Sequence, residues 1–586
     1  MWTAPYILLD DASEGGTTAR LYRDPVDIIR ADTPAGVGPA LDRLRAARVR
    51  GLHAAGYLAY EAGAAFAPKP IGMATDAPLL WFGVFARYET LAADTVAALL
   101  PDPAGAWTGA PQPAIDRETY DASLARVLDL IAAGDIYQAN LTFAAIVPFI
   151  GDPLAVYARL RRQARARYCA VIDTGTEQML SLSPELFFAL DGDRLECRPM
   201  KGTAQRGDTA EQDLACAGAL AADPKQRAEN LMIVDLMRND LSRIASDVAV
   251  PKLFTVETYP TVHQMTSTVT AMLDAGHDAI DVIAAMFPCG SITGAPKQRA
   301  MEVVAEVEKA RARGVYTGAI GRLDANGDAE FNVAIRTLAI RDGHAAIGLG
   351  SGIVADSTAD EEWAECLAKG AFVTAGQRRF DLIETMRFDP DDGLLMLERH
   401  LARMKASADA LGFTFDRHDA RNELQAATFR LRTPRRIRLL LAPSGAIAVE
   451  VAPLPFAPDR VDVAIVPLPV ASTDFRLRHK TSARAFYDDA RKAAGTFEVM
   501  FEDADGFLTE GSFTSLFVER GATLVTPPLR KGLLPGILRA DLLESGRAIE
   551  AALTRADLTA GFFIGNAVRG LIPAIVTVAN STDRRV

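Results

Sequence analysis

The stretch RPMKGTAQRG (residues 198–207) belongs to a series of nine short patterns that follow one another between Ser181 and Lys369. Each pattern combines glycine, proline, hydroxyl or charged residues in a fixed local order, whereas core packing requires only apolar side chains at helical or strand spacing. The density of these patterns indicates a chemical site. The other eight are SLSPELFF (181–188), AENLMIVDLMRNDL (228–241), VHQMTSTV (262–269), GSITGAPK (290–297), RGVYTGAIG (313–321), FNVAIRT (331–337), GSGIV (350–354) and EEWAECLAK (361–369).

Two glycine-containing stretches could be mistaken for nucleotide-binding loops. GSITGAPK lacks the Gly-Lys-Ser/Thr ending that brings a lysine to phosphates and a hydroxyl to magnesium. GLGSG (348–352) is not a G-x-G-x-x-G sequence and opens no predicted helix. We therefore predict no nucleotide site at either stretch.

The composition is that of an acidic globular protein. The 586 residues include 75 acidic and 63 basic side chains, for a net charge of −12, with 49% hydrophobic and 24% charged residues. These values exclude a disordered chain and a single small domain. The basic residues are scattered, which disfavours a nucleic-acid binder and favours a small-molecule enzyme.

Cysteine usage and hydropathy predict a cytoplasmic protein. The five cysteines form no C-x-x-C pair, so neither a disulfide framework nor a thiolate zinc site is expected. The N-terminus reaches Asp10 without a basic flank, unlike a signal peptide. The charge-free stretch 136–151 is too short and too polar for a membrane span.

Loop signals divide the chain into two modules, residues 1–375 and 378–586. The proline- and glycine-rich stretch PDPAGAWTGAPQPAI (101–115) separates an N-terminal portion, 1–115, from residues 116–375, which hold the patterns. The second boundary lies near 371–379, between a predicted helix and a predicted strand.

Residue spacing predicts a mixture of helices and strands. An amphipathic helix is expected from Arg117, where apolar residues recur every three or four positions, and Gly134 is placed to end it. Short apolar runs predict strands at 187–190 and 345–349, and a further strand begins at Phe380. Because strands and helices do not alternate regularly, we predict an α+β fold.

Taken in order, the nine patterns resemble the chorismate-utilising enzymes, which include anthranilate, aminodeoxychorismate, isochorismate and salicylate synthases. The resemblance implies an anthranilate synthase-like fold and a magnesium-dependent site for dianionic chorismate. It implies that Glu229 and Glu365 bind magnesium, with Glu362 close by. If residues 359–370 form a helix, Glu362, Glu365 and Lys369 share one stripe of it.

Lys201 distinguishes among the members of this family. It stands in Pro-Met-Lys-Gly-Thr, where anthranilate and salicylate synthases resemble one another in having alanine, and the lysine resembles aminodeoxychorismate synthase. A desolvated amine loses proton affinity and can act as a nucleophile. The resemblance implies that Lys201 adds to carbon 2 of chorismate while Glu185 protonates the departing carbon 4 hydroxyl. Ammonia then replaces the lysine and gives 4-amino-4-deoxychorismate.

The resemblance also implies residues that recognise the substrate. An arginine can fork onto a carboxylate, a phenol can donate a hydrogen bond, and glycines let backbone amides approach closely. His263 also fits the description of a satisfied core histidine. The implied set is His263, Thr293, Tyr316, Arg336, Gly350, Gly352 and Lys369.

Two further features of the first module concern its ligands. None of the five cysteines lies in a Gly-x-Cys-x-Gly turn, so the ammonia is expected from a separate glutamine amidotransferase subunit or from solution. The segments ILLDDAS (7–13) and GYLAYE (56–61) resemble the part of the family that can hold tryptophan, and whether this chain does so stays open.

The second module contains HLAR (400–403), Lys480, TEGS (509–512), GLLPGILR (532–539) and GNA (565–567). In this order they resemble the fold-type IV pyridoxal-phosphate enzymes, which include D-amino acid aminotransferases and aminodeoxychorismate lyase. The resemblance implies a smaller α/β domain in which Lys480 forms the Schiff base and Glu510 holds the pyridine nitrogen protonated. It allows a homodimer through this module. The implied phosphate-binding residues are Arg403, Gly536, Ile537 and Asn566.

Two features of the second module leave its activity open. Lys480 lies in Arg-Leu-Arg-His-Lys, which also fits a solvated basic face. Leu538 stands where relatives commonly have a threonine that binds phosphate.

Together the two resemblances imply a bifunctional enzyme of folate biosynthesis. The first module would aminate chorismate, and the second would eliminate pyruvate to leave 4-aminobenzoate. Three alternatives remain: an anthranilate synthase, a synthase whose C-terminal module is not catalytic, and a non-catalytic chorismate-binding regulator.

Overall fold

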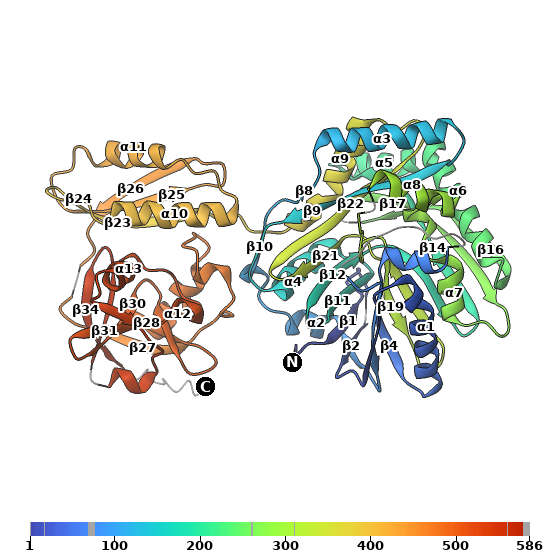
Figure 1. The fold of residues 1–586 in the computed structure, drawn as a ribbon. Helices are drawn as coiled ribbons and strands as arrows, with labels where there is room; N and C mark the ends of the chain where they lie inside the picture. The colour runs from blue at the N-terminus through green and yellow to red at the C-terminus, as the bar shows by residue number, and fades with distance from the viewer. Residues whose placement is uncertain are drawn as a thin grey trace. The chain divides into compact units, whose positions relative to one another are not determined.

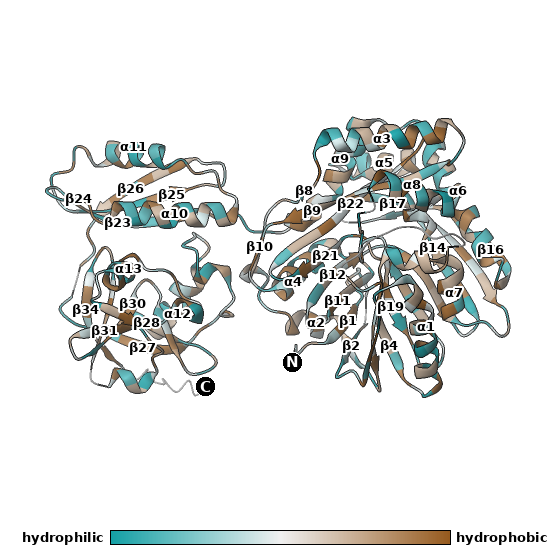
Figure 2. Cartoon of the chain, viewed as in Figure 1, coloured by the Kyte–Doolittle hydropathy of each residue, from teal (hydrophilic) through white to brown (hydrophobic). Residues whose placement is uncertain are grey.

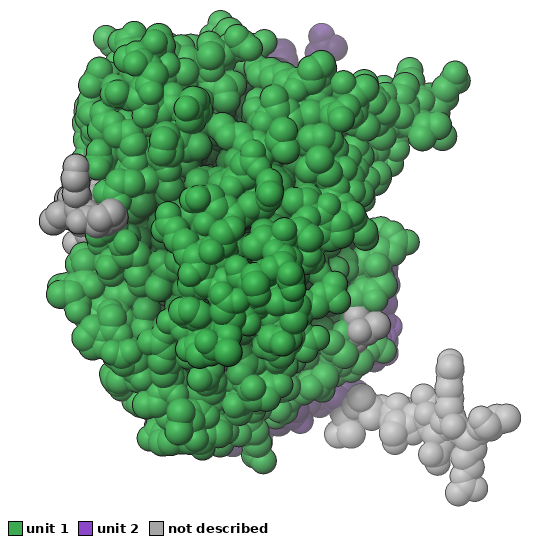
Figure 3. Space-filling view, turned by 90° about the vertical axis from the view of Figure 1, so that its right-hand side faces the viewer, with its two compact units in different colours: residues 1–100, 109–149, 156–376 green, residues 101–108, 150–155, 377–586 purple. Residues whose placement is uncertain are grey.

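The chain divides into two compact units in a computed structural model that describes residues 2–16, 18–67, 77–259, 262–309, 311–456, 458–559 and 561–577 (Figure 1). Unit 1 comprises Met1–Leu100, Gly109–Phe149 and Val156–Gly376, and unit 2 comprises Pro101–Thr108, Ile150–Ala155 and Gln377–Val586 (Figure 3). Two short segments from the first third of the chain therefore belong to unit 2. No helix in the described ranges is long and apolar enough to cross a membrane.

Two ten-stranded sheets form the frame of unit 1 in the described residues. The first has the order β18 (Gly294–Ala295), β9 (Gln138–Val147), β22 (His344–Ile353), β21 (Thr337–Arg341), β12 (Glu177–Ser183), β11 (Tyr168–Asp173), β1 (Tyr6–Asp10), β2 (Thr18–Arg23) and β6 (Glu89–Ala92), and β8 (Gln112–Pro113) pairs with β9. The second has the order β15 (Met200–Gln205), β17 (Val262–Leu273), β14 (Arg194–Arg198), β13 (Leu186–Asp191), β20 (Ala329–Val333), β19 (Ala319–Leu323), β4 (His53–Leu58), β5 (Leu80–Phe85) and β3 (Asp27–Ala31), and β16 (Ala245–Thr258) pairs with β17.

Helices cover these sheets because each has one apolar face to bury. Helix α6 packs on β15, β16 and β17, whereas α8 packs on β9 and α9 on β22. Figure 2 shows apolar residues along the strands and hydrophilic residues along much of α3. The helices of unit 1 are α1 (Pro34–Val49), α2 (Ala93–Leu99), α3 (Arg117–Ala132), α4 (Pro153–Ala164), α5 (Ala210–Ala222), α6 (Pro224–Leu241), α7 (Ala279–Met286), α8 (Lys297–Val307) and α9 (Ala359–Gly370).

The local predictions for unit 1 are confirmed at several elements. Helix α3 begins after Asp116, whose side chain accepts a hydrogen bond from the Thr119 amide, and ends just before Gly134, which has a φ of +79°. The strands expected at 187–190 and 345–349 are parts of β13 and β22, and the helix expected over 359–370 is α9. The predicted α+β class is confirmed by this mixture. The stretch 101–115, expected to be a loop, also contains the two-residue strands β7 (Trp107–Thr108) and β8.

Unit 2 contains two further sheets in the described residues. A four-stranded sheet has the order β24 (Gly393–Leu394), β23 (Leu382–Asp389), β25 (Arg435–Leu441) and β26 (Ile447–Pro453), and it packs against α10 (Leu397–Leu411) and α11 (Arg417–Thr428). An eight-stranded sheet has the order β29 (Leu508–Gly511), β28 (Glu498–Glu502), β27 (Val461–Pro467), β34 (Gly570–Val576), β33 (Phe562–Asn566), β30 (Ser515–Arg520), β31 (Thr523–Thr526) and β32 (Ala548–Glu550). Helices α12 (Ala485–Ala494) and α13 (Ile537–Glu544) pack on the larger sheet.

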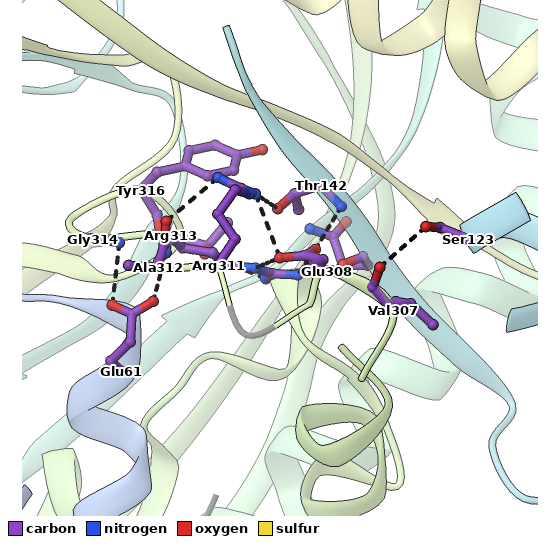
Figure 4. A network of polar contacts seen from close by, with 12 residues as sticks. Glu61, Ser123, Thr142, Val307, Glu308, Arg311, Ala312, Arg313, Gly314 and Tyr316 are labelled. Atoms are coloured by element: carbon purple, nitrogen blue, oxygen red, sulfur yellow. Dashed lines mark hydrogen bonds and ion pairs between the residues drawn. The ribbon is translucent and has the colours of Figure 1, made fainter. Parts of the chain in front are cut away.

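A buried ion pair fastens the loop between α8 and β19 to strand β9 (Figure 4). The side chains of Arg313 and Glu308 are only 1% and 2% exposed, and an Arg313 amino group lies 2.7 Å from Glu308 Oε1. The guanidinium also donates to the backbone oxygens of Asn140 and Ile292, and Glu308 accepts from the Thr142 amide. These contacts join Glu308 and Arg313 to the backbone of β9 and to each other.

Removal of the charge of Glu308 should destabilise unit 1 strongly. Glu308→Gln keeps the shape of the side chain but leaves Arg313 buried without a counter-charge. We expect the free energy of unfolding of unit 1 to fall by about 3–5 kcal/mol, the usual cost of breaking a buried pair. Urea denaturation followed by tryptophan fluorescence measures this, since Trp2, Trp81 and Trp363 belong to unit 1.

Glu306 provides the matched control, two residues away on α8. It pairs with Arg126 at 2.8 Å, and both side chains are 48% exposed. Glu306→Gln should cost less than about 1 kcal/mol, as exposed pairs do. Equal losses in the two variants would contradict the role assigned to the buried pair.

Candidate active sites

Lys201 reaches from one sheet of unit 1 to the other. It lies on β15 in the second sheet, whereas Gly352 lies on β22 in the first. A Cβ atom added at Gly352 would stand 2.6 Å from Lys201 Nζ and 2.6 Å from Gln138 Nε2. A side chain at this position would therefore displace the ends of Lys201 and Gln138 from where they lie.

The surroundings of Lys201 favour the neutral form of its amine. Burial lowers the pKa of Lys201, and the Lys369 ammonium lowers it further. The carboxylates of Glu229, Glu185 and Glu365 act in the opposite direction. The amine thus lies among charged groups from α6, α9 and the short link between β12 and β13, which are far apart in the sequence.

Glu185 is a buried acid beside this amine. Its carboxyl accepts a hydrogen bond from Ser291 Oγ at 2.7 Å and from the Met200 amide at 3.4 Å. Burial raises the pKa of Glu185 to about 7, and Lys201 partly offsets the rise. A carboxyl group with this pKa is substantially protonated near neutral pH and can serve as a general acid.

Gln138 is a site residue that the sequence patterns did not reveal. Its side chain on β9 is fully buried, and neither the amide nitrogen nor the amide oxygen has a hydrogen-bond partner among the described residues. Leaving a buried amide unpaired costs free energy, so a bound small molecule would satisfy it. The sequence signal was a glutamine at the start of an otherwise largely apolar strand.

The predicted magnesium residues lie on two helices. Glu229 is on α6, and Glu362 and Glu365 are on α9. Burial raises the pKa of Glu229, and repulsion from Glu362 and Glu365 adds to the rise against the effect of Lys201. Glu365 lies 2.6 Å from Lys369 Nζ, and Glu362 accepts from Ser357 Oγ at 2.6 Å.

These carboxylates suit a divalent cation in their chemistry. Carboxylate oxygens are ligands that magnesium prefers, and a cation would relieve their mutual repulsion. Within the described residues, however, no three His, Cys, Asp or Glu side chains are gathered closely enough to hold a metal ion. Lys369 instead neutralises Glu365 and donates to the Gly350 carbonyl at 3.0 Å.

Most of the predicted recognition residues lie on strand β22 or in the loops that contain Thr293 and Tyr316. The Tyr316 ring lies against Gly348, where an added Cβ would stand 2.0 Å from a ring atom. Thr293 donates to the Cys289 carbonyl, and its own carbonyl accepts from Asn140, which pairs with Gly352.

Arg336 is available for an anion. Its side chain forms no hydrogen bond or ion pair within the part of the chain that the structure describes, and burial lowers its pKa. It has a φ of +50°, an uncommon conformation for a non-glycine residue.

His263 is bonded to the protein on both sides of its ring. Nδ1 lies 3.1 Å from Thr258 Oγ1, and Nε2 lies 2.9 Å from Asp213 Oδ1. The side chain is almost fully buried. In this arrangement both ring nitrogens are engaged by protein groups.

Lys480 lies within a second group of polar residues, in unit 2. Its Nζ donates to Thr385 Oγ1 at 3.3 Å, and its backbone carbonyl accepts from the Ile383 amide. Burial lowers the pKa of Lys480 to about 7, and the charges of Arg403, Arg484 and Arg438 contribute against that of Glu384. The amine is therefore half neutral near pH 7, as a nucleophilic lysine requires.

Glu510 lies in the same region, on β29. It is buried and accepts a hydrogen bond from the Tyr487 hydroxyl at 2.6 Å. Burial raises the pKa of Glu510 to about 7, and Tyr487 and Arg484 oppose the rise. This carboxyl can therefore hold or release a proton near neutral pH.

Arg403 is already engaged by the protein. Its Nε and one amino group contact Glu384 at 2.8 and 2.7 Å, and the other amino group donates to the Pro535 carbonyl. Glu384 also accepts from His400 Nδ1 at 2.6 Å, and His400 Nε2 is buried without a partner among the described residues. An anionic group placed beside Arg403 would have to compete with Glu384 and the Pro535 carbonyl for the guanidinium.

The remaining predicted phosphate residues lie at two chain turns. Gly536 caps helix α13 and Ile537 is its first residue, so the helix opens where it was expected. The Asn566 side chain donates to the Phe513 carbonyl and accepts from the Val568 and Arg569 amides. Leu538 packs in an apolar cluster with Phe517 and Leu542.

Comparison with known proteins identifies both units. The model of the chorismate binding enzyme family matches residues 4–375, and that of amino-transferase class IV matches residues 381–575. A domain of the second class implies pyridoxal phosphate as cofactor. The unpaired His400 nitrogen, the lowered pKa of Lys480 and the buried Glu510 fit such a group.

Individual relatives agree with the first match. Aminodeoxychorismate synthase component 1 of Klebsiella aerogenes is 44% identical over 257 residues, covering 44% of this chain and 57% of that protein. Its counterpart in Bacillus subtilis is 39% identical over 296 residues, covering 50% and 61%. The chain thus spans less than two thirds of these relatives' length.

A solved structure confirms the predicted fold of unit 1. Anthranilate synthase component I from Streptococcus pneumoniae superposes with a TM-score of 0.55 at 28% identity, covering 62% of this chain and 93% of that protein. The family match, the relatives and the solved structure therefore agree on the fold of unit 1. The chain belongs to the chorismate binding enzyme family and carries a class IV aminotransferase domain after it.

Proposed function

We propose that this chain makes 4-aminobenzoate in two steps. Unit 1 aminates chorismate to 4-amino-4-deoxychorismate, and unit 2 eliminates pyruvate from that product. The observation that carries the proposal is the Lys201 amine between the two sheets, beside the protonatable Glu185 and the carboxylates of Glu229 and Glu365. The similarity to proteins named aminodeoxychorismate synthase supports the same assignment.

The geometry supplies a nucleophile and an acid for the first step. The neutral Lys201 amine adds to carbon 2 of chorismate, the ring double bond shifts, and the carbon 4 hydroxyl leaves as water with a proton from Glu185. Ammonia then adds at carbon 4 and the bond to Lys201 breaks. The new ammonium group at carbon 4 gives its extra proton back to Glu185, and both groups return to their starting states.

Charge and shape hold the dianion during this step. Arg336, which has no ion pair among the described residues, would bind one carboxylate, and the backbone at Gly350 and Gly352 allows close approach. Glu229, Glu362 and Glu365 are the proposed magnesium ligands on their chemistry, and they would have to draw together around the ion, since they are not gathered within the described residues. Magnesium, when bound, would neutralise the ring carboxylate. Ammonia would come from a separate glutamine amidotransferase subunit.

Unit 2 supplies matched groups for the elimination. Pyridoxal phosphate, when bound, provides an electron sink for the reacting carbon. Lys480 would attach it and afterwards move protons, since its pKa of about 7 lets the amine both take and give one. Glu510 would hold a proton at the ring nitrogen, and Arg403, Gly536, Ile537 and Asn566 would face the phosphate.

A second candidate follows from Leu538 and Arg403. Leu538 offers no hydroxyl and packs in the core, while Arg403 is already bonded to Glu384. A synthase with a non-catalytic C-terminal unit would have these features. Product analysis separates the two candidates.

Replacement of Lys201 should abolish the first step. Lys201→Ala removes the nucleophile, so we expect formation of 4-amino-4-deoxychorismate to fall by about 10³-fold or more, with any remaining product diverted to anthranilate. Chromatography with mass detection, with chorismate, magnesium and ammonium present, measures this. Lys252→Ala, at an exposed position on β16, serves as the control. An unchanged product at an unchanged rate would remove the covalent-lysine mechanism.

Glu185 should impose a pH dependence on the first step. The acid acts when protonated, so kcat/KM for chorismate should decrease as the pH rises through about 7. Glu185→Gln cannot donate the proton and should lower kcat by about 10²–10⁴-fold, with this limb of the profile lost. A wild-type profile that stays flat from pH 6 to 9 would argue against Glu185 as the acid.

Replacement of Lys480 should separate the two steps. With chorismate, magnesium, ammonium and pyridoxal phosphate, the wild-type protein is expected to give 4-aminobenzoate and pyruvate. Lys480→Ala should accumulate 4-amino-4-deoxychorismate at an unchanged rate of chorismate consumption, because Lys201 is in the other unit. If the wild-type protein also stops at this intermediate, the second candidate function is correct.

A further inference from the structure

Unit 2 carries a set of arginines around Lys480 that the proposed steps do not use. Strands β23 and β25 pair so that Thr385 lies opposite Arg438 and Arg387 opposite Arg436. The residues between them, among them Met386 and Ile437, belong to the apolar core. Because side chains alternate along a strand, the arginines lie on the face of the sheet away from that core.

Arg438 and Arg484 lie close to the Lys480 amine. The amine donates to Thr385, the register partner of Arg438. Arg484 packs over the Tyr487 ring at 4.5 Å and donates to the Ser512 carbonyl through one amino group. Its other amino group is buried and has no hydrogen-bond partner within the described residues.

Arg569, in the turn between β33 and β34, contacts Phe513, the residue that follows Ser512. Its guanidinium is 5.1 Å from the centre of the Phe513 ring, and its Nε is buried without a partner in the described part of the chain. Burial lowers the pKa of Arg569, and repulsion from Arg436 and Arg491 lowers it further against the attraction of Glu498. Arg436 and Arg569 are thus close enough to repel.

The positive charge of this region is largely uncompensated. Among the described residues, Arg436, Arg484 and Arg569 form no ion pair, and Arg438 has only Glu450 at 3.8 Å. A buried donor without a partner costs about 1–3 kcal/mol. Guanidinium groups bind carboxylates through two parallel hydrogen bonds, so an anion would satisfy the free donors and relieve the repulsion.

We propose that Arg436, Arg438, Arg484 and Arg569, here called the arginine cluster, bind the carboxylates of a dianionic substrate next to Lys480. The proposal rests on the proposed lyase function, whose substrate carries two carboxylates. A ligand with two carboxylates can contact more of these arginines at once than a ligand with one. The cluster should therefore bind dianions more tightly than monoanions. Retention of pyridoxal phosphate is assigned to other residues and should not depend on the cluster.

The test uses the whole chain loaded with pyridoxal phosphate and isophthalate, a rigid dicarboxylate, as the probe. The visible absorbance of the cofactor reports binding in unit 2 alone, so anion binding in unit 1 does not interfere. We expect isophthalate to perturb this absorbance, with benzoate binding more weakly and neutral aniline insensitive to the cluster. Arg436→Gln and Arg569→Gln should each raise the Kd for isophthalate by about 10-fold or more.

Arg555 provides a matched control on the surface of unit 2. It is 57% exposed and pairs with Glu502, so Arg555→Gln should leave the Kd unchanged. The melting temperature of Arg436→Gln should not fall, because Arg436 forms no ion pair among the described residues and is repelled by Arg569. Unchanged Kd values, or a wild-type protein that does not respond to isophthalate, would overturn the proposal. Loss of the cofactor in these variants would also overturn it, because the arginines would then hold the phosphate.

The outcome for the lyase function is separate. A wild-type protein that binds isophthalate through the cluster but converts no 4-amino-4-deoxychorismate would refute the lyase and leave the dianion site standing. A protein that forms 4-aminobenzoate normally after loss of both arginines would refute the site and leave the lyase standing.

Discussion

The close approach of Lys201 to the backbone of Gly352 sets the geometry of the candidate site in unit 1. A Cβ atom at Gly352 would stand 2.6 Å from the Lys201 amine and from the Gln138 amide, so both side chains would have to move away from this point between the sheets. The same strand keeps Gly348 free for the Tyr316 ring, and its Gly350 carbonyl receives Lys369. The glycines of β22 thus lie beside the Lys201 amine, the Tyr316 ring and the Lys369 ammonium, and bring these three groups to one strand.

Burial acts in opposite directions on acids and bases, and both units use this. It raises the pKa of Glu185 and Glu510 and lowers that of Lys201 and Lys480, which brings acid and base toward the same pH. Glu185, Glu510 and Lys480, each with a pKa of about 7, can therefore exchange protons near neutral pH. Other buried charges of unit 1, such as Arg313 and Glu308, are instead paired with each other.

Features of short range were predictable from the sequence, and those of long range were not. The limits of helix α3 follow from Asp116 and Gly134, and the helix over 359–370 follows from local spacing. Gln138 differs, because a glutamine in a strand gains meaning only when the fold leaves its amide buried and unpaired beside Lys201. Likewise, no local pattern joins Arg403 to Glu384, which are brought together by the packing of α10 on β23.

A net charge of −12 makes local positive charge a structural requirement for a chain that would take dianionic substrates. The average field repels such a ligand, so attraction must come from cations held close to the site and shielded from neutralising partners. Among the described residues, Arg336 in unit 1 forms no ion pair. The same holds in unit 2 for Arg436, Arg484 and Arg569. Exposed arginines such as Arg30 and Arg43 are instead paired with aspartates. The unpaired cations are partly or fully removed from water, where their attraction to an anion is less screened. An anionic ligand would therefore stabilise them more than it would an exposed arginine.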